Sequence, residues 1–326
     1  MPRGRRRRGP TGSAARSAST STTADRRRRT ERVIDDEPDR IIHADNLAVL
    51  PTFPDGRFTL IYLDPPFNTG RAQSRQSTRH VRVEPTDDSQ PAASGTITGF
   101  AGKRYERIRG DLLRYDDRFD DYWAFLEPRL VEAWRLLTDD GTLYLHLDYR
   151  EAHYAKVLLD ALFGRESFLN ELIWAYDYGA KAKRKWPTKH DTILVYVKNP
   201  TGYWFDSTAV DREPYMAPGL VTPEKASLGK LPTDVWWHTI VSPTGREKTG
   251  YPTQKPEGIL RRIVQASTRE GDWVLDFFAG SGTTGAVAAT LGRRFVLVDE
   301  NAEAIAVMKG RFTDVAGVVF EQGPTA

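Results

Sequence analysis

The feature that most constrains the fold is an apolar run, a glycine-rich turn and a helical pattern in the last quarter of the chain. The apolar residues 273–277 lead into the turn at residues 279–282, and a helical pattern follows over residues 283–291. A second apolar run, residues 295–298, ends in Asp299. Strands that alternate with helices in this way predict an α/β fold with a mostly parallel sheet covered on both faces.

The turn itself is typical of a nucleotide site. Only residues without a Cβ let ligand atoms approach the backbone closely, and Gly280 and Gly282 stand where the strand must turn into the helix. A turn of this kind also occurs where a helix simply packs on a sheet. Asp299, however, ends the next strand, where nucleotide-binding α/β folds hold ribose hydroxyls with a carboxylate. The two features together predict a nucleoside cofactor.

A second constellation, Asp64-Pro65-Pro66-Phe67, directly follows the apolar run 58–63. A carboxylate and a proline-flanked carbonyl held at a strand end can accept both hydrogens of an exocyclic amino group and so localise its lone pair. The aromatic ring beside them can stack on a base taken out of a duplex. The alternative interpretation is a rigid Pro-Pro turn that ends an edge strand.

The rest of the chain repeats the α/β pattern between two irregular regions. Residues 71–118 are predicted to form a long surface insertion, and residues 200–250 an irregular accessory region that is a candidate for specificity. Further helices are expected over residues 122–137, 151–163 and 256–268, and further strands over residues 142–147, 172–176 and 192–198.

Charge is distributed unevenly along the chain. Residues 1–32 hold 11 arginines and two acidic residues, whereas the remainder carries 36 basic and 42 acidic residues. Such a tail cannot bury apolar surface, so it is predicted to be disordered, and attraction to phosphates is the alternative role. No run approaches the roughly 18 apolar residues of a membrane span, and no secretory pattern opens the chain. A cytoplasmic, nucleoid-associated protein with no membrane partner is expected.

Cations alternate with aromatic rings in the segment 174–190. Such a stretch can contact phosphates and stack on bases, and the alternative is a solvated loop whose rings belong to the core. The predicted DNA-contacting residues are Lys181, Lys183, Arg184, Lys185 and Lys189. Trp236 and Trp237 fit either a core or a readout surface.

Cysteine and histidine usage excludes several chemistries. The chain has no cysteine, which rules out disulfides, thiolate metal sites and cysteine nucleophiles. His146 and Asp148 follow a predicted strand, but the six histidines show no ligand spacing such as HExxH, so no metal site is predicted.

Three motifs, at residues 64–70, 251–256 and 276–284, resemble in their order the amino-methylating DNA methyltransferases of the β arrangement. The resemblance covers residues 40–312 and has the circularly permuted order in which the catalytic motif precedes the cofactor motif. It implies a Rossmann-like methyltransferase fold that depends on S-adenosylmethionine, with a seven-stranded sheet and an inserted target-recognition region. It further implies double-stranded DNA as substrate, base flipping and frequently a homodimer, and it leaves a cognate restriction endonuclease open as a partner.

The resemblance also implies a role for each matching residue. Asp64 would accept the amino hydrogens, the Pro65 carbonyl would make the second contact, Pro66 completes the motif and Phe67 would stack on the flipped base. In the cofactor set, Asp276 and the turn would cradle the methionine part, Asp299 would hold the ribose and residues 253–255 would close the pocket. The implied cofactor residues are Asp45, Thr253, Gln254, Lys255, Asp276, Phe277, Ala279, Gly280, Gly282, Thr283 and Asp299.

The implied division of the chain has four parts. Residues 1–39 are the tail, 40–199 the catalytic half with the insertion 71–118, 200–250 the target-recognition region and 251–326 the cofactor-binding half. The recognition sequence cannot be derived from these segments, because base readout depends on geometry.

The acceptor is narrowed by two observations. Carbon-5 methylation of cytosine works through a cysteine adduct, and the chain has no cysteine. In the resembling family, Asp before the prolines favours adenine N6 and Ser favours cytosine N4. The alternatives are an N4-cytosine enzyme, an RNA or protein-glutamine methyltransferase, in which the glycine-rich motif normally comes first, and a non-catalytic DNA-binding or S-adenosylmethionine-binding subunit.

Overall fold

The structure, a computed structural model, describes residues 37–67, 120–177, 181–242 and 244–324. The predicted insertion 71–118 and all but the last three residues of the predicted tail 1–39 lie outside these ranges. The first strand, β1, begins at Asp39, which is the last residue of the predicted tail.

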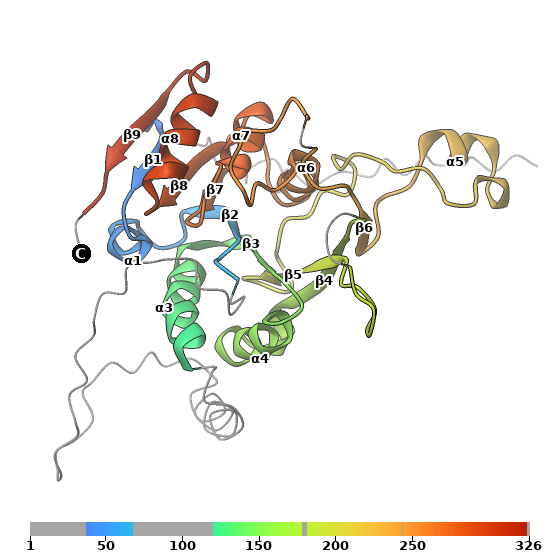
Figure 1. The fold of residues 1–326 in the computed structure, drawn as a ribbon, viewed down its shortest axis with the longest axis horizontal. Coiled ribbons are helices and arrows are strands. Elements are labelled where there is room, and N and C mark those ends of the chain that lie inside the picture. The colour runs from blue at the N-terminus through green and yellow to red at the C-terminus, as the bar shows by residue number, and fades with distance from the viewer. Residues whose placement is uncertain (1–36, 68–119, 178–180, 243, 325–326) are drawn as a thin grey trace, which may run out of the picture. The chain divides into compact units, whose positions relative to one another are not determined.

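Within these ranges, one sheet of nine strands forms the centre of the fold (Figure 1), in the order β6-β4-β5-β3-β2-β7-β8-β1-β9. Neighbouring strands are parallel except that β5 runs antiparallel to both β3 and β4. The α/β class and the mostly parallel sheet are therefore confirmed. The strands are β1 (Asp39–His43), β2 (Phe58–Leu63), β3 (Leu137–Leu147), β4 (Phe168–Ala175), β5 (His190–Val197), β6 (Val235–Trp237), β7 (Trp273–Asp276), β8 (Arg294–Asp299) and β9 (Val318–Gln322).

The expected number of seven strands is wrong, because both edges of the sheet extend further. β9 pairs with β1 in parallel, and an ion pair of 2.6 Å between Arg40 and Glu321 ties the two strands together. β6 pairs with β4 and buries Trp236, although it lies in the region 200–250 that was expected to be irregular. Trp237 on the same strand is 67% exposed, so one ring belongs to the core and the other to the surface.

Helices cover both faces of the sheet. One face packs against α1, α3 and α4, and the other against α6, α7 and α8 (Figure 1). No helix within the described ranges is both long and apolar enough to cross a bilayer. The helices are α1 (Asn46–Val49), α3 (Asp120–Leu136), α4 (Ala152–Phe163), α5 (Pro223–Leu228), α6 (Glu257–Ser267), α7 (Thr283–Thr290) and α8 (Ala302–Arg311), with short 3-10 turns at Leu50–Thr52, Arg165–Ser167 and Pro218–Leu220.

The central strands explain where a site can form. Every residue of β2 is buried, as expected of a strand covered on both faces. β2 pairs in parallel with β7, although the two strands are about 200 positions apart in the sequence. Their carboxyl ends therefore meet at one edge of the sheet, which is where α/β folds bind ligands.

Candidate active site

A cavity of about 1290 Å³ opens at the carboxyl ends of β2, β7 and β8. All four predicted catalytic-motif residues line it, and so does every predicted cofactor residue except Gly282. The fold thus brings the Pro-Pro motif and the glycine-rich turn into one shared space.

Gly282 serves packing instead of lining the cavity. Its φ of +73° lies in the left-handed region, and an added Cβ would come within 2.8 Å of Met308 and 2.9 Å of Phe312. Its contact with the cofactor stays a prediction, since Gly282 does not line the cavity. The residue lets the start of α7 lie close against α8.

Asp64 and Lys255 form an ion pair at the wall of the cavity. The Lys255 ammonium donates to Oδ2 of Asp64, and the two side chains are only 11% and 16% exposed. The same ammonium lies 5.1 Å from the centre of the Phe67 ring, within the range of a cation–π contact. Lys255, expected to close the cofactor pocket, thus contacts the carboxylate of Asp64, which is predicted to be catalytic, and the aromatic ring beside it.

The other oxygen of Asp64 is arranged differently. Oδ1 is buried and has no hydrogen-bond partner among the described residues. A buried carboxylate oxygen without a donor is costly, so its presence in a cavity points to a donor that arrives with a ligand.

The glycine-rich turn is tied to the end of β8. The Gly280 amide donates to Oδ2 of Asp299 at 2.8 Å, and the Asn301 amide donates to Oδ1 at 2.8 Å. An added Cβ on Gly280 would come within 3.2 Å of the Tyr251 ring. Asp299 therefore both lines the cavity and braces the turn, and Gly280 makes room for the segment that covers it.

That covering segment, residues 247–255, is held by its own hydrogen bonds. The Gln254 side chain accepts from the Thr249 amide at 2.8 Å and donates to the Glu247 carbonyl at 2.6 Å. The Thr283 hydroxyl, on the first residue of α7, donates to the Lys255 carbonyl at 3.2 Å. The segment is thereby fixed between Asp64 and the glycine-rich turn.

Asp276 lies at the end of β7, fully buried beneath the turn. Its carboxylate accepts from the Thr284 hydroxyl at 2.6 Å and from the Phe278 amide at 3.0 Å. Burial raises the pKa of Asp276 to about 7, despite these two donors, and the nearby Asp64 and Asp299 add to the rise. This carboxyl group titrates near neutral pH and favours a cationic ligand when it is ionised.

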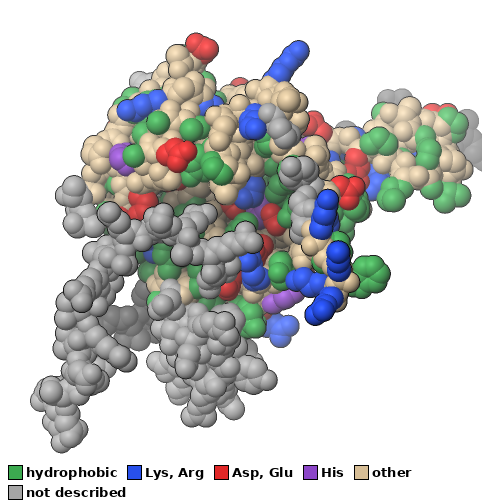
Figure 2. Space-filling model, in the orientation of Figure 1, with side chains coloured by type: hydrophobic (Ala, Val, Ile, Leu, Met, Phe, Trp, Pro, Cys, Tyr) green, Lys and Arg blue, Asp and Glu red, His purple; other side chains and the backbone are tan. Residues whose placement is uncertain are grey.

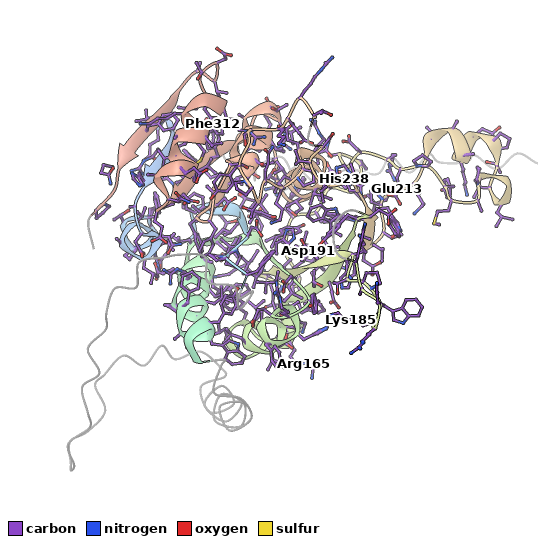
Figure 3. The ribbon with its side chains drawn as sticks, in the orientation of Figure 1. Arg165, Lys185, Asp191, Glu213, His238 and Phe312 are labelled. Carbon is purple, nitrogen blue, oxygen red and sulfur yellow. The ribbon has the colours of Figure 1, made fainter. Side chains whose placement is uncertain are left out.

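A chain of buried hydrogen bonds forms the floor of the cavity on the opposite side. Tyr62 Oη lies 2.7 Å from His146 Nδ1, His146 Nε2 lies 3.2 Å from Asp191 Oδ2, and the Tyr176 hydroxyl donates to Asp191 Oδ1 at 3.0 Å. Burial alone would raise the pKa of Asp191, but the hydrogen bond and charge of His146, with the charge of Lys255, bring it below its usual value. Asp191 lies at the start of β5, and Figure 3 labels it near the middle of the molecule.

Sequence reasoning missed most of this floor. Tyr176 and Asp191 flank the basic segment and line the cavity, and Trp174 beside them is buried. The rings of Trp174 and Tyr176 line the cavity and also pack in or against the core, whereas Trp186 of the same segment is exposed. The sequence contains one indication of a role for Tyr176 and Asp191, which is that they flank the segment predicted to contact DNA.

The Asp45 side of the cavity has a buried cation that the sequence did not indicate. Asp45 caps α1 by accepting from the Leu47 amide at 2.7 Å, and its carboxylate lies 3.7 Å from the guanidinium of Arg129. Arg129 also donates to Asn46 at 2.7 Å. The predicted cofactor residue Asp45 therefore has a charged neighbour on α3.

The predicted DNA-contacting residues lie outside the cavity lining. The first four, from Lys181 to Lys185, are exposed on the hairpin between β4 and β5, and Lys189 is half-buried near its base. Figure 2 shows a row of Lys and Arg side chains on the surface of this hairpin.

Comparisons with known proteins agree with this geometry. A family of N6 and N4 methyltransferases, described as DNA methylase, matches residues 58–310, which is more than half of the chain. The chain belongs to the DNA methylase family. The DNA adenine methyltransferase YhdJ of Escherichia coli (strain K12) is 31% identical to it over 277 residues, which cover 82% of this chain and 81% of that protein.

Two solved structures share the fold of this DNA methylase. The PvuII DNA methyltransferase, titled cytosine-N4-specific, superposes with a TM-score of 0.57 at 16% identity over 86% of this chain and 88% of that one. A putative DNA modification methylase of Thermus thermophilus, in complex with S-adenosyl-L-methionine, has a TM-score of 0.50 at 20% identity over 86% and 99% of the two chains. The expected methyltransferase fold is therefore confirmed.

Proposed function

We propose that this DNA methylase transfers a methyl group from S-adenosylmethionine to the exocyclic N6 of adenine in double-stranded DNA. The observation that carries the proposal is the buried Oδ1 of Asp64, which has no donor among the described residues and lies in the cavity that also contains the glycine-rich turn. An amino group of a flipped base is a donor of the required kind.

The charge of the cavity fits S-adenosylmethionine, the methyl donor that membership of this family implies. Its sulfonium and its amino group are both cationic, and acidic side chains outnumber basic ones in the lining by six to three. Asp299 would hold the ribose, and Asp276 and the backbone of the turn would hold the methionine part. The acidic residues are Asp45, Asp64, Asp191, Asp276, Asp299 and Glu300, and the basic ones Arg129, Lys248 and Lys255.

The residues around Asp64 would prepare the acceptor nitrogen. Oδ1 of Asp64 would accept one hydrogen of the amino group, and the Pro65 carbonyl would accept the other. The lone pair of the amino nitrogen would then no longer be delocalised into the ring of the base. Phe67 would stack on the base. Bound S-adenosylmethionine supplies an electrophilic methyl group, and Asp64 is placed to take the proton that the nitrogen loses.

The choice of adenine rests on Asp64. In the family that the motifs resemble, Asp at this position favours adenine and Ser favours cytosine, and YhdJ, which shares 31% identity, carries an adenine-specific name. Transfer to cytosine N4 is the second candidate and is an outcome of the experiment below.

DNA would approach over the hairpin between β4 and β5. Residues 181–189 contain five cations and no acidic residue, whereas the chain after residue 32 is acidic overall. A local positive charge on an otherwise acidic protein attracts phosphates to this place in particular.

The experiment supplies the purified protein with methyl-labelled S-adenosylmethionine and genomic DNA and digests the DNA to nucleosides. Label in N6-methyl-2′-deoxyadenosine is expected, whereas label in N4-methyl-2′-deoxycytidine would overturn the adenine assignment and unlabelled DNA would overturn the function. Asp64→Asn should reduce transfer by at least about 100-fold while the affinity for S-adenosylmethionine stays within about threefold. The matched control is Asp55→Asn, because Asp55 is exposed and lies outside the cavity.

A further inference from the structure

Trp186 is 93% exposed on the hairpin that joins β4 to β5. A large aromatic ring in full contact with water contributes nothing to the core, in contrast to Trp174 and Trp236, which are buried. Residues 181–187 are all exposed, and the cations of the hairpin stand on both sides of the ring in the sequence. An aromatic ring among cations matches the chemistry of stacked bases between phosphates.

The hairpin is held at a fixed place beside the cavity. Its two ends are joined by the bond of 3.0 Å from the Tyr176 hydroxyl to Asp191, and both residues line the cavity. The Tyr176 amide also donates to the Lys189 carbonyl at 2.9 Å, and the Lys189 ammonium donates to the Asp177 carbonyl at 2.8 Å. In Figure 3, Asp191 lies near the middle of the molecule and Lys185 lies farther out on the same hairpin.

This arrangement joins two requirements of base flipping. Turning a nucleotide out of the duplex leaves a gap in the stack, and its neighbours lose their stacking partner on one side. DNA-bending proteins insert apolar side chains between neighbouring base steps, and basic side chains contact the DNA beside them. The residues at the base of the hairpin line the cavity, so an aromatic ring on the hairpin can contact the duplex next to the base that enters the cavity.

We propose that Trp186 inserts into the base stack of duplex DNA and occupies the gap that the target nucleotide leaves. The inference rests on the proposed function, because it requires that the target base enters the cavity beside Asp64. It adds that the cost of opening the duplex is offset by a residue outside the cavity.

The test compares two duplexes that carry the recognition sequence, which is first read from the positions that the wild-type protein methylates. One duplex is intact, and in the other the base opposite the target is replaced by an abasic site, so that the target is already unpaired. Trp186→Ala should lower kcat/KM by on the order of 10- to 100-fold on the intact duplex and by less than about threefold on the abasic duplex. Trp186→Phe should retain most of the activity on both duplexes.

Two controls separate insertion from simple contact. Lys183→Ala should lower kcat/KM by the same factor on both duplexes and reduce its salt dependence, because a phosphate contact does not depend on pairing. Trp237→Ala removes another exposed ring, on β6, and should not distinguish the two duplexes.

The outcomes are separable from failure of the proposed function. If Trp186→Ala loses the same factor on both duplexes, or nothing on either, insertion is overturned while the methyltransferase function stands. If the wild-type protein transfers no methyl group to either duplex, the proposed function itself fails. Fluorescence of 2-aminopurine placed beside the target gives a second readout, and the wild-type protein should change it more than Trp186→Ala does.

Discussion

Replacing Lys255 with methionine tests the ion pair at the centre of the site. The substitution keeps an unbranched side chain that is one atom shorter, and it removes the ammonium that donates to Asp64. Removal of one partner from a buried pair costs about 3–5 kcal/mol, because the other charge stays buried without compensation. With the side chains 11% and 16% exposed, the lower end applies, and Lys255→Met should lose about 3 kcal/mol of unfolding free energy.

The variant Asp64→Asn completes a double-mutant cycle. Each single variant leaves one buried charge uncompensated, whereas the double variant Asp64→Asn/Lys255→Met leaves none. The double variant should therefore be no less stable than either single variant, with a coupling energy of about 2–3 kcal/mol. Urea unfolding at pH 7 followed by far-UV circular dichroism measures all four proteins. Asp55→Asn is the control and should lose no more than about 1 kcal/mol, because Asp55 is 79% exposed. Coupling below about 0.5 kcal/mol would refute the ion-pair reasoning.

Two further predictions concern the glycine-rich turn. Burial raises the pKa of Asp276 to about 7, so the folded protein favours the neutral carboxyl, and unfolding free energy should fall as pH rises from about 4 to about 7. The cationic S-adenosylmethionine favours the ionised form, so its affinity by titration calorimetry should rise by up to roughly tenfold from pH 6 to 8, and a rise that persists in Asp276→Asn would contradict this origin. Gly282→Ala should lower the unfolding free energy, measured by thermal unfolding, by about 2 kcal/mol. The cause is the φ of +73° together with the close approach of the added Cβ to Met308 and Phe312. An unchanged unfolding free energy would disprove the packing role.

The parts of the site that the sequence predicted are those encoded by contiguous residues. The Pro-Pro motif after β2 and the glycine-rich turn after β7 each combine a strand, a turn and a polar group within about ten positions. Local pattern is enough to recognise such elements. Their meeting in one cavity also followed, because parallel strands end at a common edge.

The missed features depend on contacts between distant residues. Lys255 lies 191 positions from the carboxylate that it contacts, and His146 and Asp191 are 45 positions apart. No spacing rule connects such residues, so the sequence did not predict the buried series of hydrogen bonds at the floor of the cavity. A lysine in a predicted cofactor motif gave no sign that its ammonium donates a hydrogen bond to Asp64.

The two added strands have a similar explanation. β6 is three residues long and lies among prolines and glycines, so its pattern is too short to identify. β9 follows the last helix and alternates weakly in burial. Both gain their place from pairing with β4 and β1, which is a tertiary effect.

The central claim is that the methyl donor and the Asp64 carboxylate face each other across one cavity. A crystal structure with sinefungin, in which an amino-bearing carbon replaces the methylated sulfonium, tests it most directly. The added amino group is predicted to point toward Asp64 and to lie within about 6 Å of Oδ1, which leaves room for the acceptor nitrogen between them. Sinefungin bound with that amino group directed away from Asp64, or bound outside the cavity, would contradict the account.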